Sequence, residues 1–140
     1  MPINRDITKC IYSILALLFI ALVIPIATFA QTANWEVPDS SLEIQNPLES
    51  SERVLTAGKN IYTQLCAVCH GNKGAGDGIT AAALQPKPAN FLTAAFQEQT
   101  DGAIYYKISE GRPPMPGFKT QLNEQQTWAI VHYLRSLEVE

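Results

Sequence analysis

One stretch of five residues constrains the chain most, Cys66-Ala67-Val68-Cys69-His70. Two thiols at this spacing lie on the same side of a helical turn, so both can add to the vinyl groups along one edge of a haem. His70 follows directly and can offer a ring nitrogen to the iron, because histidine is a usual proximal haem ligand. The pattern therefore predicts one covalent haem c with its iron, attached through Cys66 and Cys69 and ligated by His70.

Three other uses of paired cysteines fit the sequence less well. A redox C-x-x-C pair opens a helix inside a βαβ unit, whereas a glycine-rich loop, residues 71–78, follows the pair here. A zinc site needs four ligands, and His132, the only other histidine, lies in a different helical pattern. A structural disulfide would use both thiols but leave the adjacent His70 unexplained.

The composition bounds the size of the protein and the partners it can bind. A chain of 140 residues fits one domain. From Gln31 onward it holds eight Lys or Arg and twelve Asp or Glu, so no basic patch indicates nucleic acid. The acidic excess weakly favours a basic or neutral contact surface on a partner. A domain this small buries a modest core, to which a covalent haem would add apolar surface.

The first thirty residues are typical of a leader. Residues 11–30 form an uncharged run after a weakly positive start, and the run ends in Thr28-Phe29-Ala30. The small residues Thr28 and Ala30, at the −3 and −1 positions, favour cleavage of a secretory signal peptide after Ala30. A run of this length can also span a bilayer, so an uncleaved membrane anchor remains the alternative. Either form predicts a periplasmic location or the outer face of the inner membrane.

The remaining chain divides into an arm and a helical domain. Residues 31–51 contain Pro38 and Pro47 without a sustained period, which predicts a linker or an arm lying on the domain. Residues 52–140 form the domain. Apolar residues recur there at helical spacing, which makes the expected fold class all-α.

Helix boundaries follow from capping residues. Long helices are predicted over residues 52–66, 101–110 and 123–137, and a short helix over residues 90–96. Each prediction starts from a capping residue of a favoured type: Ser51, Asn90, Thr100 and Asn123. In the last helix Gln126 can complete a capping box with Asn123.

Met115 is the candidate for the second iron ligand. It is the only methionine besides the initiator, and it lies between prolines in the stiff segment 112–118. A fixed backbone presents the thioether at a set place, which suits a metal ligand better than a flexible gap-filler. Ordinary apolar filling is the alternative use of Met115. His132 is expected at the surface and is the alternative iron ligand.

Together these features resemble the class I c-type cytochromes, single-haem electron carriers, over about residues 52–137. Gly58 and Tyr62 precede Cys66 at the spacing of that family. There, the small residue and the aromatic form the contact where the first and last helices cross. Ile130 and Tyr133 resemble the partner positions on the last helix.

The resemblance implies a small all-α domain wrapped around one covalent haem, with His70 and Met115 as axial ligands. It also implies that a loop proline, Pro86 or Pro88, offers its carbonyl to His70. The sequence of residues 101–108 resembles bacterial membrane-associated members of the family, which are found beside respiratory complexes or dehydrogenases.

The expected function is electron transfer through the haem, as a carrier or as a subunit of a respiratory or dehydrogenase complex, without enzyme activity of its own. A His and thioether pair favours ferrous iron and raises the potential. The expected partners are redox proteins that make small, brief contacts, with a membrane respiratory complex as one candidate. The alternative is a haem enzyme, such as a peroxidase, or a small-ligand sensor, and both need an open sixth iron position.

Overall fold

The computed structural model describes residues 35–137. The predicted leader, residues 1–30, lies outside the described residues, as do residues 31–34 and 138–140. Within the described range no helix has the length and apolar character needed to cross a membrane.

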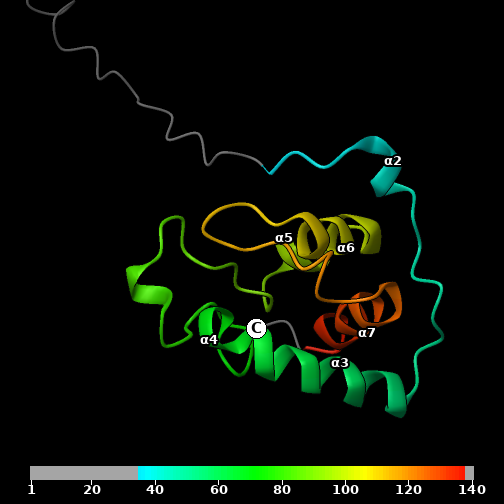
Figure 1. The fold of residues 1–140 in the computed structure, drawn as a ribbon, viewed down its shortest axis with the longest axis horizontal. Helices are drawn as coiled ribbons and strands as arrows, with labels where there is room; N and C mark the ends of the chain where they lie inside the picture. Colours follow the sequence, from blue (N-terminus) through cyan, green and yellow to red (C-terminus); the bar gives the residue numbers. More distant parts are fainter. Residues whose placement is uncertain (1–34, 138–140) are drawn as a thin grey trace, which may run out of the picture. The chain divides into compact units, whose positions relative to one another are not determined.

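The described part of the chain is helical and contains no strand, which confirms the all-α prediction. Its elements in order are α2 (Asp39–Leu42), α3 (Glu52–Leu65), α4 (Ala67–His70), the 3-10 helix η1 (Ala81–Ala83), α5 (Ala94–Gln97), α6 (Asp101–Glu110) and α7 (Glu124–Arg135). Helices α3 and α7 lie against each other, and α6 packs on α7 (Figure 1).

Three of the four predicted caps are present. The Ser51 and Thr100 side chains accept hydrogen bonds from backbone N–H groups in the first turns of α3 and α6. Asn123 and Gln126 form the complete capping box of α7. These caps satisfy N–H groups that a helix start leaves without partners, so each fixes where its helix begins.

The predicted cap at Asn90 is wrong. Its side chain accepts from the N–H of Leu92 at 2.8 Å and so stabilises a turn before the helix. Helix α5 begins later, at Ala94, where the Thr93 hydroxyl accepts from Phe96 N–H at 3.4 Å. Both residues are good caps, and the path of the loop decides between them.

The crossing of α3 and α7 is as close as the sequence predicts. A Cβ added at Gly58 would lie 2.0 Å from the backbone oxygen of Ala129 and 3.0 Å from the Cβ of Tyr133. The rings of Tyr62 and Tyr133 lie beside this contact with centroids 5.1 Å apart. The glycine is therefore required because the two helix backbones meet there.

Before α3, residues 36–50 follow the surface of the helical domain as an arm. Helix α2 packs on α6, where a Cβ added at Gly102 would lie 1.9 Å from the backbone oxygen of Ser41. The side chain of Asn46 donates to the carbonyl of Trp128 in α7 at 3.1 Å. The arm therefore contacts two helices of the domain.

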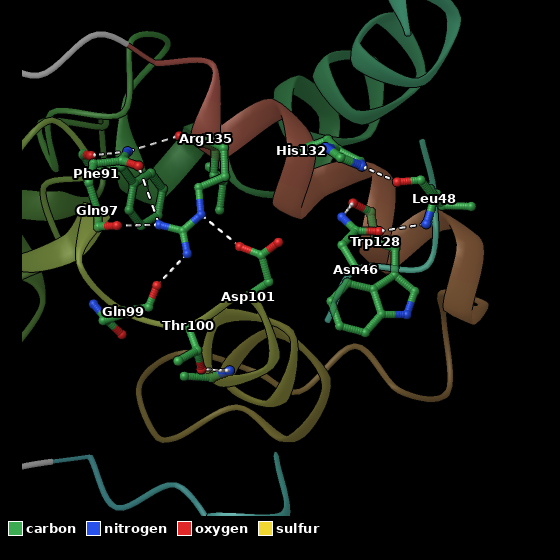
Figure 2. A network of polar contacts seen from close by, with 12 residues as sticks. Asn46, Leu48, Phe91, Gln97, Gln99, Thr100, Asp101, Trp128, His132 and Arg135 are labelled. Atoms are coloured by element: carbon green, nitrogen blue, oxygen red, sulfur yellow. Dashed lines mark hydrogen bonds and ion pairs between the residues drawn. The ribbon is translucent and has the colours of Figure 1, made fainter. Parts of the chain in front are cut away.

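His132 is hydrogen-bonded to this arm, so the prediction that it lies at the surface is corrected. It is half-buried, and its Nε2–H donates to the carbonyl of Leu48 at 2.8 Å (Figure 2). A nitrogen engaged in this way argues against His132 as the alternative iron ligand. The helical pattern placed it on the polar side of α7, and the arm then covers that side.

Arg135 joins the end of α7 to the turn between α5 and α6. Its guanidinium forms an ion pair with Asp101 at 2.8 Å and donates to the backbone oxygens of Gln97 and Gln99 (Figure 2). Bonds to several acceptors from one planar group hold that turn in a single arrangement.

Candidate functional site

The predicted attachment motif lies on one helical turn at the end of α3. Cys66 separates α3 from the short helix α4, and its carbonyl accepts from the N–H of His70 at 2.9 Å. Cys66 and Cys69 are free thiols, both half-buried. Burial, followed by the nearby Cys69, raises the pKa of Cys66 to about 12, so this thiol is neutral at pH 7. Residues 35–137 hold no cluster of three or more His, Cys, Asp or Glu that could bind zinc.

His70 is oriented by its surroundings. The residue is 9% exposed, and its ring stacks on that of Phe91 with centroids 4.5 Å apart. Its Nδ1 lies 3.1 Å from the carbonyl oxygen of Ala89, which can only accept, so Nδ1 carries the proton. Burial lowers the pKa of His70 more than this hydrogen bond raises it, and the neutral ring is therefore favoured. The neutral tautomer leaves Nε2 for a metal.

The carbonyl that orients His70 belongs to Ala89, so the prediction of Pro86 or Pro88 is wrong. The carbonyl of Pro88 instead lies over Gly76, where it would be 2.7 Å from an added Cβ. The carbonyl of Ala89, one residue further along the chain, is the one within hydrogen-bonding distance of the imidazole. The signal in the sequence is Phe91, an aromatic residue two positions later that fixes this segment by stacking on His70.

The glycine-rich loop runs back along the attachment motif. The N–H of Gly76 donates to the carbonyl of His70 at 2.8 Å, and that of Gly78 to Cys69 at 3.1 Å. A Cβ added at Gly78 would lie 2.4 Å from the carbonyl oxygen of Val68. The loop needs glycine because its backbone lies directly on the backbone of the motif.

The segment around Met115 is fixed at the end of α6. Arg112 and Met115 exchange two backbone hydrogen bonds of 2.8 and 3.0 Å, which close a tight turn. Gly111, with φ +68, lets this turn approach Gly117, since an added Cβ would lie 2.3 Å from the Gly117 nitrogen. The Met115 side chain is half-buried and packs against the hydrophobic core.

The residues present fit a covalent haem. Both thiols of the motif are unpaired, as thioether formation requires. Nδ1 of His70 is bonded to Ala89, whereas Nε2 has no hydrogen-bond partner among the described residues. Every buried side-chain nitrogen or oxygen in that part of the chain has a hydrogen-bond partner. Because Nε2 has none, it is not buried and solvent can reach it. A ring nitrogen of this kind is available to bind iron.

Comparisons with known proteins agree with this chemistry. Residues 55–138 match the family model described as cytochrome c. Cytochrome c6 of Euglena gracilis is 29% identical over 79 residues, which cover 55% of this chain and 85% of that protein.

Two solved structures are also similar. A chain of the reducing HAO-like protein complex of Kuenenia stuttgartiensis matches with a TM-score of 0.60 and 34% identity, covering 66% of this chain. The match spans only 47% of that longer chain. The c-type cytochrome KustC0563 matches with a TM-score of 0.51 and 30% identity, over 58% of this chain and 96% of that one.

Proposed function

Because the chain belongs to the cytochrome c family and transfers electrons through a covalently bound haem c, we propose that His70 and Met115 are the two axial ligands of its iron. Cys66 and Cys69 carry the thioether bonds. The observation that carries this proposal is the hydrogen bond from His70 Nδ1 to Ala89, because it directs the other ring nitrogen to the metal.

Each of these residues has a separate task. The thiols anchor the cofactor, and the Ala89 carbonyl with the Phe91 ring hold the imidazole in one orientation. The Met115 thioether is a soft ligand that favours ferrous iron. When bound, the haem supplies one-electron exchange between ferric and ferrous iron. With both axial positions filled, the protein acts as a carrier and has no enzyme activity of its own.

The contact with redox partners lies beside the attachment motif. Val68 and Ile79 are 46% and 90% exposed there, although both have aliphatic side chains. Exposed apolar side chains next to the cofactor suit small, brief contacts with a partner. The similarity to a chain of the HAO-like complex supports a role as a subunit of a larger redox assembly, and a membrane respiratory or dehydrogenase complex is the proposed assembly.

The proposed location is the periplasm or the outer face of the inner membrane, to which residues 1–30 direct the chain. Their composition supports a signal peptide cleaved after Ala30. Mass spectrometry of native protein tests this proposal. A mass that begins near Gln31 supports cleavage, whereas a mass that includes residues 1–30 identifies an anchor held through residues 11–30.

Optical spectra of the purified holoprotein test the proposed ligands. Ferric protein with a sulfur ligand shows a weak near-infrared charge-transfer band, and its ferrous form binds carbon monoxide slowly or not at all. A wild-type ferrous protein that binds carbon monoxide rapidly would instead indicate an open sixth position. A ligand sensor or a peroxidase would then be the better function.

A further inference from the structure

Thr80 contacts the attachment motif through its side chain. Its hydroxyl oxygen lies 2.9 Å from the carbonyl oxygen of Val68 and 3.2 Å from the sulfur of Cys69. We propose that Thr80 is a positioning residue, whose hydroxyl holds the Cys69 sulfur for haem attachment and then remains hydrogen-bonded to the thioether. This inference rests on the attachment of haem through Cys69.

The backbone on both sides of Thr80 is fixed, so its hydroxyl has a defined place. Its own N–H donates to the Val68 carbonyl at 3.1 Å, and its carbonyl accepts from Ala83 at 3.1 Å as η1 begins. The ammonium of Lys87 then binds the carbonyls of Ala81 and Ala82 at 3.0 and 2.9 Å. Lys87 thereby holds the 3-10 helix that follows Thr80 in place through its backbone carbonyls.

The donors and acceptors at this contact match both states of the sulfur. In the free thiol, the weak S–H donor of Cys69 can point at the Thr80 oxygen while the hydroxyl donates to Val68. A thioether has no proton and can only accept, so the hydroxyl proton is then shared between the sulfur and the Val68 carbonyl. Attachment moves the thiol hydrogen to the vinyl carbon that does not bind sulfur, and it requires no oxidant or reductant.

The two cysteines of the motif are held in different ways. Cys66 packs against the hydrophobic core, and no hydrogen bond to its sulfur is present within residues 35–137. Cys69 instead has the Thr80 hydroxyl. A hydrogen bond to the Cys69 thioether withdraws electron density from the haem edge and so raises the midpoint potential.

The first experiment replaces Thr80 in the full holoprotein. Thr80→Val keeps the shape of the side chain and removes the hydroxyl, and Thr80→Ser keeps the hydroxyl. The readouts are the midpoint potential and the share of haem attached through one thioether, from the pyridine spectrum of the reduced haem. We expect Thr80→Val to lower the potential and raise the singly attached share, and Thr80→Ser to match wild type. Thr63→Val, which removes a hydroxyl bonded to Lys59 within α3, should change neither.

A double-mutant cycle shows whether the hydroxyl acts through the sulfur. In a Cys69→Ala background the haem is attached through Cys66 alone, and Thr80→Val should shift the potential no further. An equal shift in both backgrounds would mean that Thr80 acts through Val68, which overturns the inference. If the Thr80→Val variant does not yield folded holoprotein, Thr80→Ala replaces it in the same cycle.

The remaining outcomes are also decisive. If Thr80→Val matches wild type in both readouts, the hydroxyl does not position the sulfur. If Thr80→Ser changes both readouts as much as Thr80→Val, the methyl group matters and the hydroxyl does not. A wild-type protein without covalent haem would contradict the proposed function itself, and this is seen before any variant is compared.

Discussion

The Nδ1 of His70 lies 3.1 Å from the carbonyl oxygen of Ala89, and the two residues are 19 positions apart in the chain. The loop between them therefore determines which ring nitrogen is free. Phe91 closes this loop, since its N–H donates to the carbonyl of Gly74 at 2.7 Å and its ring stacks on His70. The orientation of the candidate iron ligand thus depends on a side chain that does not bind the metal.

Phe91→Leu should loosen His70 as well as destabilise the core. Replacing a buried ring that also contacts Tyr62 and Phe96 should cost about 2 kcal/mol or more of unfolding free energy. The measurement is chemical denaturation of the holoprotein together with its ferrous spectrum. Leu92→Ala, at an equally buried position, should destabilise the fold without changing the spectrum. A Phe91→Leu spectrum identical to wild type would show that the stacking does not orient His70.

Gly58→Leu should destabilise the domain by about 2 kcal/mol or more, the usual scale of overpacking. Even a Cβ at this position would lie 2.0 Å from the Ala129 carbonyl oxygen, so α3 and α7 must separate. The midpoint of chemical denaturation of the holoprotein measures the effect. Ala57→Leu, at the exposed neighbouring position, is the matched control and should leave the midpoint nearly unchanged.

Tyr62 should make stability depend on alkaline pH. Burial, the largest cause, raises the pKa of its hydroxyl, which donates to the Gly71 carbonyl at 2.6 Å. The folded state therefore keeps a proton that the unfolded state loses, and the stabilisation is complete below about pH 10 and declines above it. In Tyr62→Phe this decline should be smaller, which denaturation curves at pH 8 to 11 measure. Parallel declines in the two proteins would assign the effect to another group.

Local features of the fold could be predicted from the sequence, and contacts made by loops could not. Ser51, Thr100 and Asn123 cap helices because a cap depends only on the next few residues. The crossing at Gly58 was predicted because its residue types resemble those of the family. The choice of Ala89 over either proline depends instead on the path of a long loop, which local propensity does not determine.

The same limit explains His132. Its position in the helical pattern of α7 is polar, and only the return of a distant segment, 84 positions earlier, covers it. The attachment motif could be recognised because its chemistry lies within five adjacent residues. Thr80 was missed because its contact with Cys69 depends on how the glycine loop folds back.

The arm should detach locally when its polar contacts are removed. Asn46→Ala and His132→Ala each delete one bond between the arm and α7, which should cost about 1 kcal/mol apiece. Amide hydrogen exchange over residues 36–50 should rise in both variants, while the haem spectrum stays that of wild type. Gln45→Ala, at an exposed position of the arm, is the control and should leave both the hydrogen exchange of the arm and the haem spectrum unchanged. Unchanged exchange in both variants would show that α2 and its contact with α6 hold the arm alone.

The proposed function depends most on Met115. Met115→Ala should abolish the near-infrared sulfur band of the ferric protein and open the sixth position to carbon monoxide and water. The midpoint potential should fall, because the soft sulfur no longer favours ferrous iron. Peroxidase activity should appear, since peroxide then reaches the metal. Absorption spectra and potentiometry of the purified variant measure the first three changes, and a turnover assay measures the fourth.

Two comparisons separate ligation from packing at Met115. The side chain packs against the core, so its loss also costs stability. Met115→Leu keeps most of that apolar volume and should restore stability but neither the band nor the potential, because only sulfur binds the iron. His132→Ala should leave band, potential and carbon monoxide binding as in wild type, since its Nε2 is bonded to Leu48. If Met115→Leu left the potential and carbon monoxide binding as in wild type while His132→Ala changed both, the sixth ligand would be His132, and the arm would have to move to release it.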